Sequence, residues 1–291
     1  MALDLNTLKV RSISAAVFVI VLLSAVYLNY YTFFFFFFFV AMWALKEFYD
    51  LSEKLGVTVY RGIGMLGGFI SFISVYARHF DDQFVQLPFL FLIQNLIYLV
   101  PFVIAIKFLF SETTQPFHSF VYSIAGILYC ILPFALLVQI PIQSTPEGIT
   151  EQLATYNYFK VLGIILLIWS NDTFAYLGGS LFGKDKMYEK VSPGKTWEGT
   201  IIGVILTIGV GLVLNYDHTF SSPIIWPAIS LFIGIFGTIG DLVESWMKRK
   251  AGVKDSGNIM PGHGGILDRF DSLLFVSPFL FVMIKSLEKF I

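Results

Sequence analysis

The chain has 291 residues, of which 56% are hydrophobic and only 13% are charged, and its formal net charge is −1. Soluble domains carry roughly 25% charged residues, so this composition indicates lipid rather than water as the main solvent. The balanced charge gives no support for a basic nucleic-acid-binding face, and a single cysteine, Cys130, excludes an internal disulfide and a multi-cysteine metal site.

Apolar stretches of membrane-spanning length recur along the whole chain. A transmembrane helix needs about 20 mainly apolar residues, and the period-two alternation of membrane barrels is absent. The sequence therefore predicts an all-α integral membrane protein, a polytopic bundle of about nine transmembrane helices, the first of them uncleaved. The run Phe33–Phe39 in the second span is expected to face lipid. The predicted spans are 12–29, 31–49, 62–78, 87–110, 119–140, 158–180, 198–215, 224–244 and 271–290.

Lysine and arginine set the predicted orientation. Cytoplasmic segments of membrane proteins carry an excess of these residues. With a cytoplasmic N-terminus, all but four of the 19 lysines and arginines fall on the cytoplasmic side, the exceptions being Arg78, Lys160, Lys285 and Lys289. We therefore expect a cytoplasmic N-terminus. The expected location is the cell inner (plasma) membrane, with several crossings and the active site on the cytoplasmic side.

Polar motifs concentrate after residue 168, and this division predicts the domain organisation. Residues 1–157 are expected to form an N-terminal transmembrane scaffold of about five helices. Residues 158–291 are expected to form a C-terminal catalytic transmembrane region. Its cytoplasmic loops are predicted at 181–197 and 245–270.

Carboxylates inside predicted spans are costly and mark functional candidates. Asp172 lies well inside one apolar run, and Asp241 and Glu244 end another. On a helix Asp241, Glu244, Ser245 and Lys248 share one face. Two structural alternatives are open, because Glu244 could simply pair with Lys248, and Asp172 could bond to a neighbouring helix.

The segment VSPGKTWEGT at 191–200 has the features of a helix start. Ser192 is the expected N-cap, with Pro193 at the first helical position. Lys195 and Thr196 would then lie at a helix N-terminus, whose free N–H groups attract anions. We interpret this segment as both a helix start and a phosphate-binding site.

The densest polar segment of the chain is DSGNIMPGHGGILDRFD at 255–271. Its glycines, including Gly264, allow the backbone to approach a ligand closely. Asp268 and Asp271 lie one helical turn apart, with Arg269 between them. Oxygen ligands without thiolates suit a hard cation such as Mg2+, which usually bridges to substrate phosphates. Together with the lysines, these acids predict phosphoryl or nucleotidyl transfer at a lipid–water boundary.

The same segment carries a resemblance to a known family. Residues 245–271, SWMKRKAGVKDSGNIMPGHGGILDRFD, resemble the signature of the phosphatidate cytidylyltransferases, also called CDP-diacylglycerol synthases. NDTFAY at 171–176, SPGKTWEG at 192–199 and GDLVES at 240–245 resemble further motifs of that family. The resemblance covers roughly residues 170–272 and is long and specific.

The resemblance implies the reaction of CTP with phosphatidate to give CDP-diacylglycerol and pyrophosphate. It implies Mg2+ as cofactor, a second cation being left open, and membrane lipid and CTP as partners; a homodimer is also left open. Asp241 and Asp268 would be the leading metal ligands, supported by Glu244 and Asp271. Catalytic roles are implied for Asp241, Asp268, Lys195 and Asp172. Substrate-binding roles are implied for Ser192, Thr196, Glu198, Lys248, Arg249, His263, Gly264 and Arg269, with His263 favoured as a turn residue or phosphate contact over a general base.

Two other functions are weighed against this one. A CTP-dependent lipid-alcohol kinase would release CDP, whereas a cytidylyltransferase releases pyrophosphate. An ion-coupled transporter would hold its acids near the membrane midplane, often in two related halves. The 255–271 segment favours the cytidylyltransferase, and the absence of internal symmetry counts against the transporter.

Overall fold

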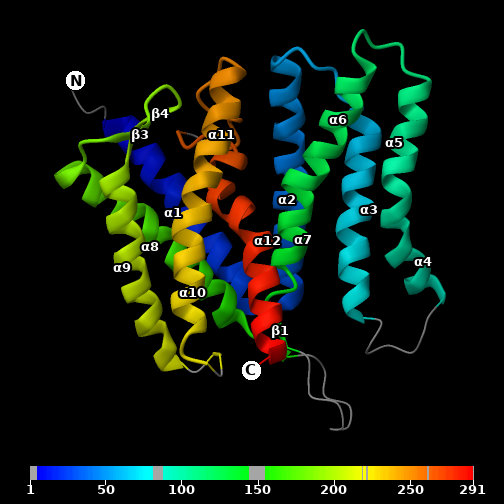
Figure 1. Ribbon diagram of the computed structural model, residues 1–291. Coiled ribbons are helices and arrows are strands. Elements are labelled where there is room, and N and C mark those ends of the chain that lie inside the picture. The colour runs from blue at the N-terminus through cyan, green and yellow to red at the C-terminus, as the bar shows by residue number, and fades with distance from the viewer. Residues whose placement is uncertain are drawn as a thin grey trace. The chain divides into compact units, whose positions relative to one another are not determined.

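The computed structural model describes residues 5–80, 88–143, 155–217, 219–220, 222–260 and 262–290, most of them helical (Figure 1). Pro261 and most of the predicted outer loop 143–158 lie outside these residues. The described residues divide into two compact units. Unit 1 takes those within Met1–Gln139 and Lys250–Arg269, and unit 2 takes those within Ile140–Ser144, Ala154–Arg249 and Phe270–Ile291.

Unit 1 is built mainly from helices. Those lying wholly within it are α1 (Leu5–Leu28), α2 (Tyr30–Lys54), α3 (Arg61–Phe80), α4 (Pro88–Leu96), α5 (Val100–Leu109), α6 (Pro116–Gly126) and α7 (Leu132–Leu137), with a 3-10 turn η1 (Ile97–Leu99) and a π-helical turn η2 (Ile127–Ile131). Asn29 separates α1 from α2. Its Oδ1 accepts the Thr32 N–H at 3.0 Å, and the Thr32 hydroxyl accepts the Asn29 N–H at 3.2 Å. This reciprocal capping starts the second helix directly after the first.

Unit 2 combines long helices with two short hairpins. Its elements are β1 (Ile142–Gln143), β2 (Thr155–Tyr156), α8 (Tyr158–Phe182), β3 (Lys186–Tyr188), β4 (Ser192–Thr196), α9 (Trp197–Leu214), η3 (Asn215–Asp217), α10 (Ile225–Phe232), η4 (Ile233–Gly237) and α11 (Thr238–Lys250). β1 pairs antiparallel with β2, and β3 with β4. The last helix, α12 (Leu267–Phe290), begins with residues of unit 1 and continues in unit 2.

Small residues bring α8 and α9 close together within unit 2. A Cβ at Gly199 would lie 2.6 Å from the Ala175 carbonyl oxygen, and one at Gly203 would lie 2.9 Å from the Ala175 Cβ. Small residues of this kind let helix backbones approach closely in lipid. The contact fixes the first turns of α9, and with them the end of β4, against α8.

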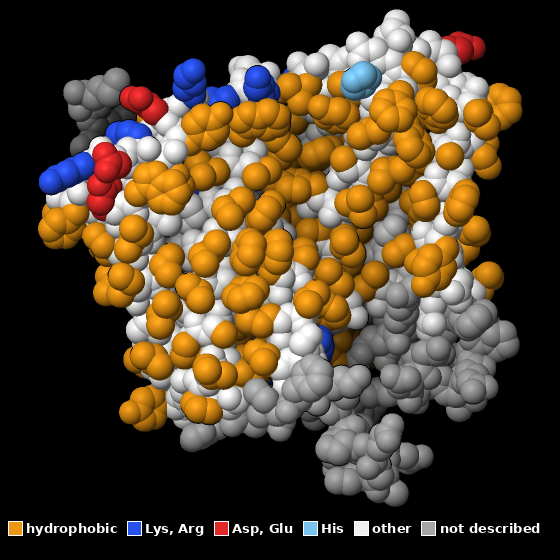
Figure 2. Space-filling model, viewed as in Figure 1, with side chains coloured by type: hydrophobic (Ala, Val, Ile, Leu, Met, Phe, Trp, Pro, Cys, Tyr) orange, Lys and Arg blue, Asp and Glu red, His pale blue; other side chains and the backbone are white. Residues whose placement is uncertain are grey.

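The helices match the predicted spans. Eight of those described are long and apolar enough to cross a membrane, and the apolar segment Arg61–Val75 supplies a shorter ninth. In the part of unit 2 seen in Figure 2, hydrophobic side chains cover α9 and α10, while charged side chains gather near β3 and β4. The prediction of a polytopic all-α membrane protein is therefore confirmed.

The phenylalanine run is only partly exposed. Phe35 and Phe39 are 54% and 67% exposed, as expected of side chains that face lipid. Phe33, Phe34 and Phe37 are instead buried inside unit 1. The prediction that the whole run faces lipid is wrong, because a helix that packs on one side must bury part of any uniform run.

The predicted helix start at Ser192 is also wrong. Ser192–Thr196 forms strand β4, and α9 begins at Trp197 with Thr196 as its N-cap. The Thr196 hydroxyl accepts the Gly199 N–H at 3.2 Å and so provides the cap that was expected of Ser192. Lys195 and Thr196 still lie at a helix N-terminus, as predicted.

Candidate active site

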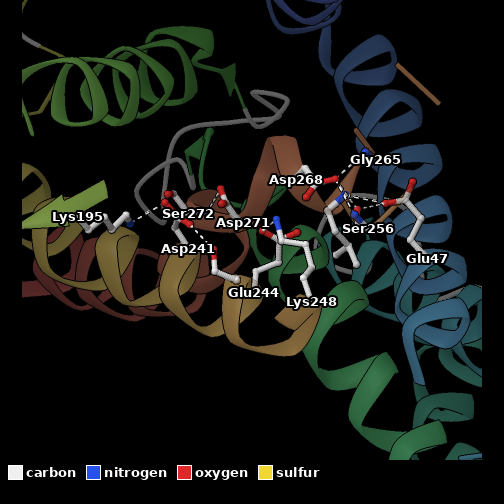
Figure 3. A network of polar contacts seen from close by, with 12 residues as sticks. Glu47, Lys195, Asp241, Glu244, Lys248, Ser256, Gly265, Asp268, Asp271 and Ser272 are labelled. Carbon is white, nitrogen blue, oxygen red and sulfur yellow. Dashed lines mark hydrogen bonds and ion pairs between the residues drawn. The ribbon is translucent and has the colours of Figure 1, made fainter. Parts of the chain in front are cut away.

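Three carboxylates converge in unit 2. Asp241 and Glu244 lie one turn apart on α11, and Asp271 lies on α12. One carboxylate oxygen from each lies within 4.8 Å of those of the other two. Figure 3 shows these side chains turned toward one another. We call these three residues the carboxylate cluster.

A lysine from the β3–β4 hairpin reaches this cluster. The Lys195 ammonium lies 2.6 Å from Asp241 Oδ2 and donates to the Thr238 carbonyl at 3.4 Å. The Ser245 hydroxyl donates to the other Asp241 oxygen, Oδ1, at 3.1 Å. Both Asp241 oxygens therefore have protein partners, and the side chain keeps a fixed orientation. At 32% and 24% exposed, the Asp241 and Lys195 side chains remain accessible to a substrate.

A second lysine lies on the buried side of the cluster. The Lys248 ammonium is 3.0 Å from Glu244 Oε2, and the Glu244 side chain is fully buried. The alternative that Glu244 pairs with Lys248 is therefore correct, and Glu244 belongs to the carboxylate cluster as well. A buried carboxylate needs such a partner, because burying an unpaired charge is very costly.

Asp271 and Asp172 approach the cluster from other helices. Asp271 Oδ1 accepts the Ser272 N–H at 2.7 Å, and the Ser272 hydroxyl donates to the Gly237 carbonyl at 3.2 Å. This second bond ties the start of α12 to the end of η4. Asp172, on α8, is exposed, and it lies within electrostatic range of Lys195 and Asp241. The structure thus brings Asp172 and the carboxylate cluster of unit 2 together with the predicted Lys195.

The remaining predicted residues of the β3–β4 region hold its backbone. Glu198 accepts the N–H groups of Lys184 and Asp185 at 3.1 and 3.2 Å, which closes the hairpin against the first turn of α9. Ser192 begins β4, where it pairs with Tyr188. The Arg249 side chain is exposed near the end of α11.

Asp268 lies in a different environment, within unit 1. Its Oδ2 accepts the Ser256 N–H at 2.8 Å and the Gly265 N–H at 2.7 Å, and it lies 2.9 Å from the Ser256 hydroxyl. Gly264 has φ +80°, and a Cβ there would collide with the Asp268 carboxylate. The glycine-rich segment is therefore folded tightly around this acid.

A residue that the sequence prediction missed, Glu47, joins the same network. It lies on α2, is 3% exposed, and accepts the Ser256 hydroxyl at 2.9 Å (Figure 3). Its two oxygens also accept the N–H groups of Ile266 and Leu267 at 3.0 and 2.9 Å. A single carboxylate inside a predicted span was the signal that could have found it, since such groups are expensive in lipid. We call Glu47, Ser256 and Asp268 the loop network.

The predicted histidine contacts the first helix of unit 1. His263 Nδ1 lies 2.8 Å from the Ser14 hydroxyl, and Arg11 donates through Nε to the Gly262 carbonyl at 3.0 Å. These contacts hold the glycine-rich turn against α1. The Arg269 side chain is exposed.

The donor set of the carboxylate cluster suits a hard divalent cation. It offers carboxylate oxygens only, which are the ligands that Mg2+ and similar ions prefer. Three carboxylates within 4.8 Å of one another also repel, and a bound cation would relieve that repulsion. Lys195 adds a positive group beside Asp241, at a place where a phosphate could be held.

Fold and site together define the class of protein: a polytopic membrane protein with clustered acids and lysines of the kind that handle phosphate groups. The chain belongs to the cytidylyltransferase family, whose model matches residues 9–287.

Curated relatives support this assignment. A phosphatidate cytidylyltransferase of Staphylococcus aureus (strain COL) is 32% identical over 278 residues, which cover 95% of this chain and 99% of the relative. The one from Staphylococcus saprophyticus is 33% identical over the same length and shares. The one from Bacillus subtilis (strain 168) is 44% identical over 135 residues, 46% of this chain and 50% of the relative. The predicted family is therefore confirmed.

Proposed function

We propose that the chain is a membrane nucleotidyltransferase that converts CTP and phosphatidate into CDP-diacylglycerol and pyrophosphate in phospholipid biosynthesis. The observation that carries the proposal is the carboxylate cluster with Lys195 against Asp241, in a chain of the cytidylyltransferase family. The names of the full-length relatives support the choice of substrates.

Asp241, Glu244 and Asp271 would hold Mg2+. Asp268, one helical turn before Asp271 on α12, is the further ligand that we propose. The ion, when bound, would neutralise charge on the substrate phosphates and act as a Lewis acid. Whether a second cation binds is left open.

The reaction depends mainly on how the protein positions its two substrates. An oxygen of the phosphatidate phosphate attacks the α-phosphorus of CTP, a new phosphorus–oxygen bond forms, and the bond to the leaving pyrophosphate breaks. The attacking phosphate is already ionised near neutral pH, so no strong general base is required. The work of the protein is then to align two anionic groups and offset their repulsion.

Lys195 lies where it can offset the repulsion between the two anionic substrates. Its ammonium is held by Asp241 and by the Thr238 carbonyl, so its position is fixed before substrate binds. The free N–H groups at the start of α9, directly after Thr196, add a site for phosphate oxygens. Lys248 pairs with Glu244 at 3.0 Å and holds its orientation, and the exposed Arg249 and Arg269 side chains are the further cations that we propose for the triphosphate.

The charge distribution supports an active site that faces the cytoplasm. The hairpin that carries Lys195 also holds Lys186 and Lys190, and Lys184 lies just before it. Helix α11 ends in Lys248, Arg249 and Lys250. Under the positive-inside rule these segments are cytoplasmic. We accordingly propose a plasma-membrane location with a cytoplasmic N-terminus, and CTP drawn from the cytoplasm; a homodimer stays a prediction.

Two alternatives are not favoured. The relatives that match nearly the whole chain are named phosphatidate cytidylyltransferases, not kinases or transporters. A kinase and a cytidylyltransferase differ in which phosphate of CTP reaches the lipid, and this difference supplies the test.

The experiment uses CTP labelled at either the α- or the γ-phosphate. Detergent-purified protein is mixed with Mg2+ and with either phosphatidate or a lipid alcohol such as diacylglycerol, and the lipid phase is then counted. With phosphatidate we expect the α-label in lipid and the γ-label in released pyrophosphate. The γ-label in lipid would establish a kinase instead, and no label in lipid from either CTP would contradict the proposal.

A further inference from the structure

Glu47 is a buried acid that no motif of the sequence singles out. It lies near the C-terminal end of α2, and its carboxylate accepts three hydrogen bonds, from Ile266 N–H, Leu267 N–H and the Ser256 hydroxyl. The residues it joins are more than 200 positions away in sequence, since Ser256 lies 209 residues after it. Because α12 begins at Leu267, Glu47 receives N–H groups at a helix N-terminus, where negative charge is favoured.

The glycine-rich segment is shaped to admit this carboxylate. A Cβ at Gly257 would collide with Glu47 Oε1, and a Cβ at Gly265 would collide with both Glu47 oxygens and the Ser256 hydroxyl. The backbone can surround the acid only where these side chains are absent. The glycines therefore provide room for a particular side chain from another helix, in addition to flexibility.

Ser256 joins Glu47 to Asp268. Its hydroxyl lies 2.9 Å from Glu47 Oε2 and 2.9 Å from Asp268 Oδ2, and its N–H donates to the same Asp268 oxygen. A movement of the Glu47 carboxylate would move the serine, and the serine would change the orientation of Asp268. The contact chain is short, buried at Glu47 and half-buried at Asp268, and entirely within unit 1.

We propose that Glu47 is a positioning residue for the reaction: through Ser256 and the N–H groups of Ile266 and Leu267 it sets the orientation of the Asp268 carboxylate. The proposal depends on the proposed function, in which Asp268 is a metal ligand. Groups that orient metal ligands commonly contribute about 10- to 100-fold to metal affinity or activity.

A carboxylate is needed at this position. Both Glu47 oxygens face donors, so Glu47→Gln would turn an amide NH2 toward an N–H group or the serine hydroxyl and lose at least one bond. Ser256→Ala would remove the hydroxyl that joins Glu47 to Asp268 and leave the bonds from Ile266 and Leu267 to Glu47. The two variants therefore separate the link from the anchoring of the helix.

The test measures metal affinity directly. Mn2+ binding to detergent-purified Glu47→Gln, Ser256→Ala and the double variant is followed by the electron paramagnetic resonance of free Mn2+. In parallel, kcat and the KM for CTP are measured with phosphatidate. Glu53→Gln is the matched control, because it is an acid-to-amide change on the same helix whose carboxylate pairs with Arg61 at 3.0 Å.

We expect Mn2+ affinity and kcat to fall about tenfold or more in both single variants, with little change in the KM for CTP. The double variant should lose no more metal affinity than Glu47→Gln alone, since both act through one contact chain. Glu53→Gln should match the wild type. Should Glu47→Gln fail to fold, Ser256→Ala carries the same comparison.

Unchanged Mn2+ affinity in folded Ser256→Ala would overturn the inference, as would losses in the two single variants that add in the double variant. Failure of the proposed function gives a different result. In that case the wild type would leave no CTP label in lipid, while Mn2+ binding would still report on Glu47.

Discussion

The carboxylate cluster and the loop network use the same kind of side chain in opposite ways. In the cluster, Asp241, Glu244 and Asp271 bring oxygens within 4.8 Å of one another. In the loop network, Asp268 Oδ2 and both Glu47 oxygens accept hydrogen bonds from backbone N–H groups and one serine. The first arrangement concentrates negative charge and the second disperses it over fixed donors.

This difference separates acids whose oxygens the fold holds through hydrogen-bond donors from acids that face one another. Acids that face N–H donors stabilise the fold, because those donors would otherwise be buried without partners. Acids that face other acids destabilise the empty site and favour a bound cation. Stability and activity should therefore change in different proportions when each group is altered.

The largest effect is expected for Asp271→Asn. Removing one of three clustered carboxylates should lower CDP-diacylglycerol synthesis by about 100-fold or more, since a charge-stabilising group is lost from the reaction site. The temperature of unfolding should stay the same or rise, because repulsion within the cluster is reduced. Activity is measured by lipid labelling, and unfolding by thermal denaturation in detergent.

Glu189→Gln is the control for this change, because Glu189 is an exposed acid of unit 2 in the turn of the β3–β4 hairpin. It should retain wild-type activity. A marked loss of thermal stability in Asp271→Asn would contradict the assignment of this acid to the ligand-binding group.

Asp268→Asn should lower the free energy of unfolding, which Asp271→Asn should not. The amide can keep only part of the acceptor role toward Ser256 and Gly265, so we expect a loss of about 1–3 kcal/mol in the free energy of unfolding. The measurement is denaturant or thermal unfolding of the detergent-solubilised protein. An Asp268→Asn variant as stable as the wild type would remove the contrast between the two groups.

The smallest effect is expected for Glu198→Gln. Its exposed carboxylate accepts two backbone N–H groups of the loop before β3, and an amide oxygen can still accept one of them. Activity should fall by less than about threefold, mainly through a higher KM for CTP. Steady-state kinetics check this, and a loss as large as that of Asp271→Asn would place Glu198 among the ligand-binding acids.

The spans and most of the cluster could be predicted from sequence because their signals are local. An apolar run of span length needs no knowledge of its neighbours, and Asp241, Glu244 and Lys248 share a helix face by spacing alone. Asp172 and Lys195 stood out because charge is rare beside such runs.

The rest depends on contacts between distant segments. Nothing near Glu47 shows that Ser256 will meet it 209 residues later. The β3–β4 hairpin was missed because SPGK can start a helix or form a strand, and pairing with residues 186–188 decides between them. Whether a given phenylalanine of 33–39 meets lipid or protein depends on what packs beside α2.

A change of metal preference tests the central claim, that the carboxylate cluster holds the catalytic cation. Asp241→Cys replaces a hard oxygen ligand with a soft thiolate, which binds Mg2+ poorly and softer ions such as Cd2+ well. The only native cysteine, Cys130, is buried and would compete little. We predict that Asp241→Cys is inactive with Mg2+ and regains part of its lipid-labelling activity when Cd2+ is added. Wild-type activity of Asp241→Cys with Mg2+ alone would contradict the account.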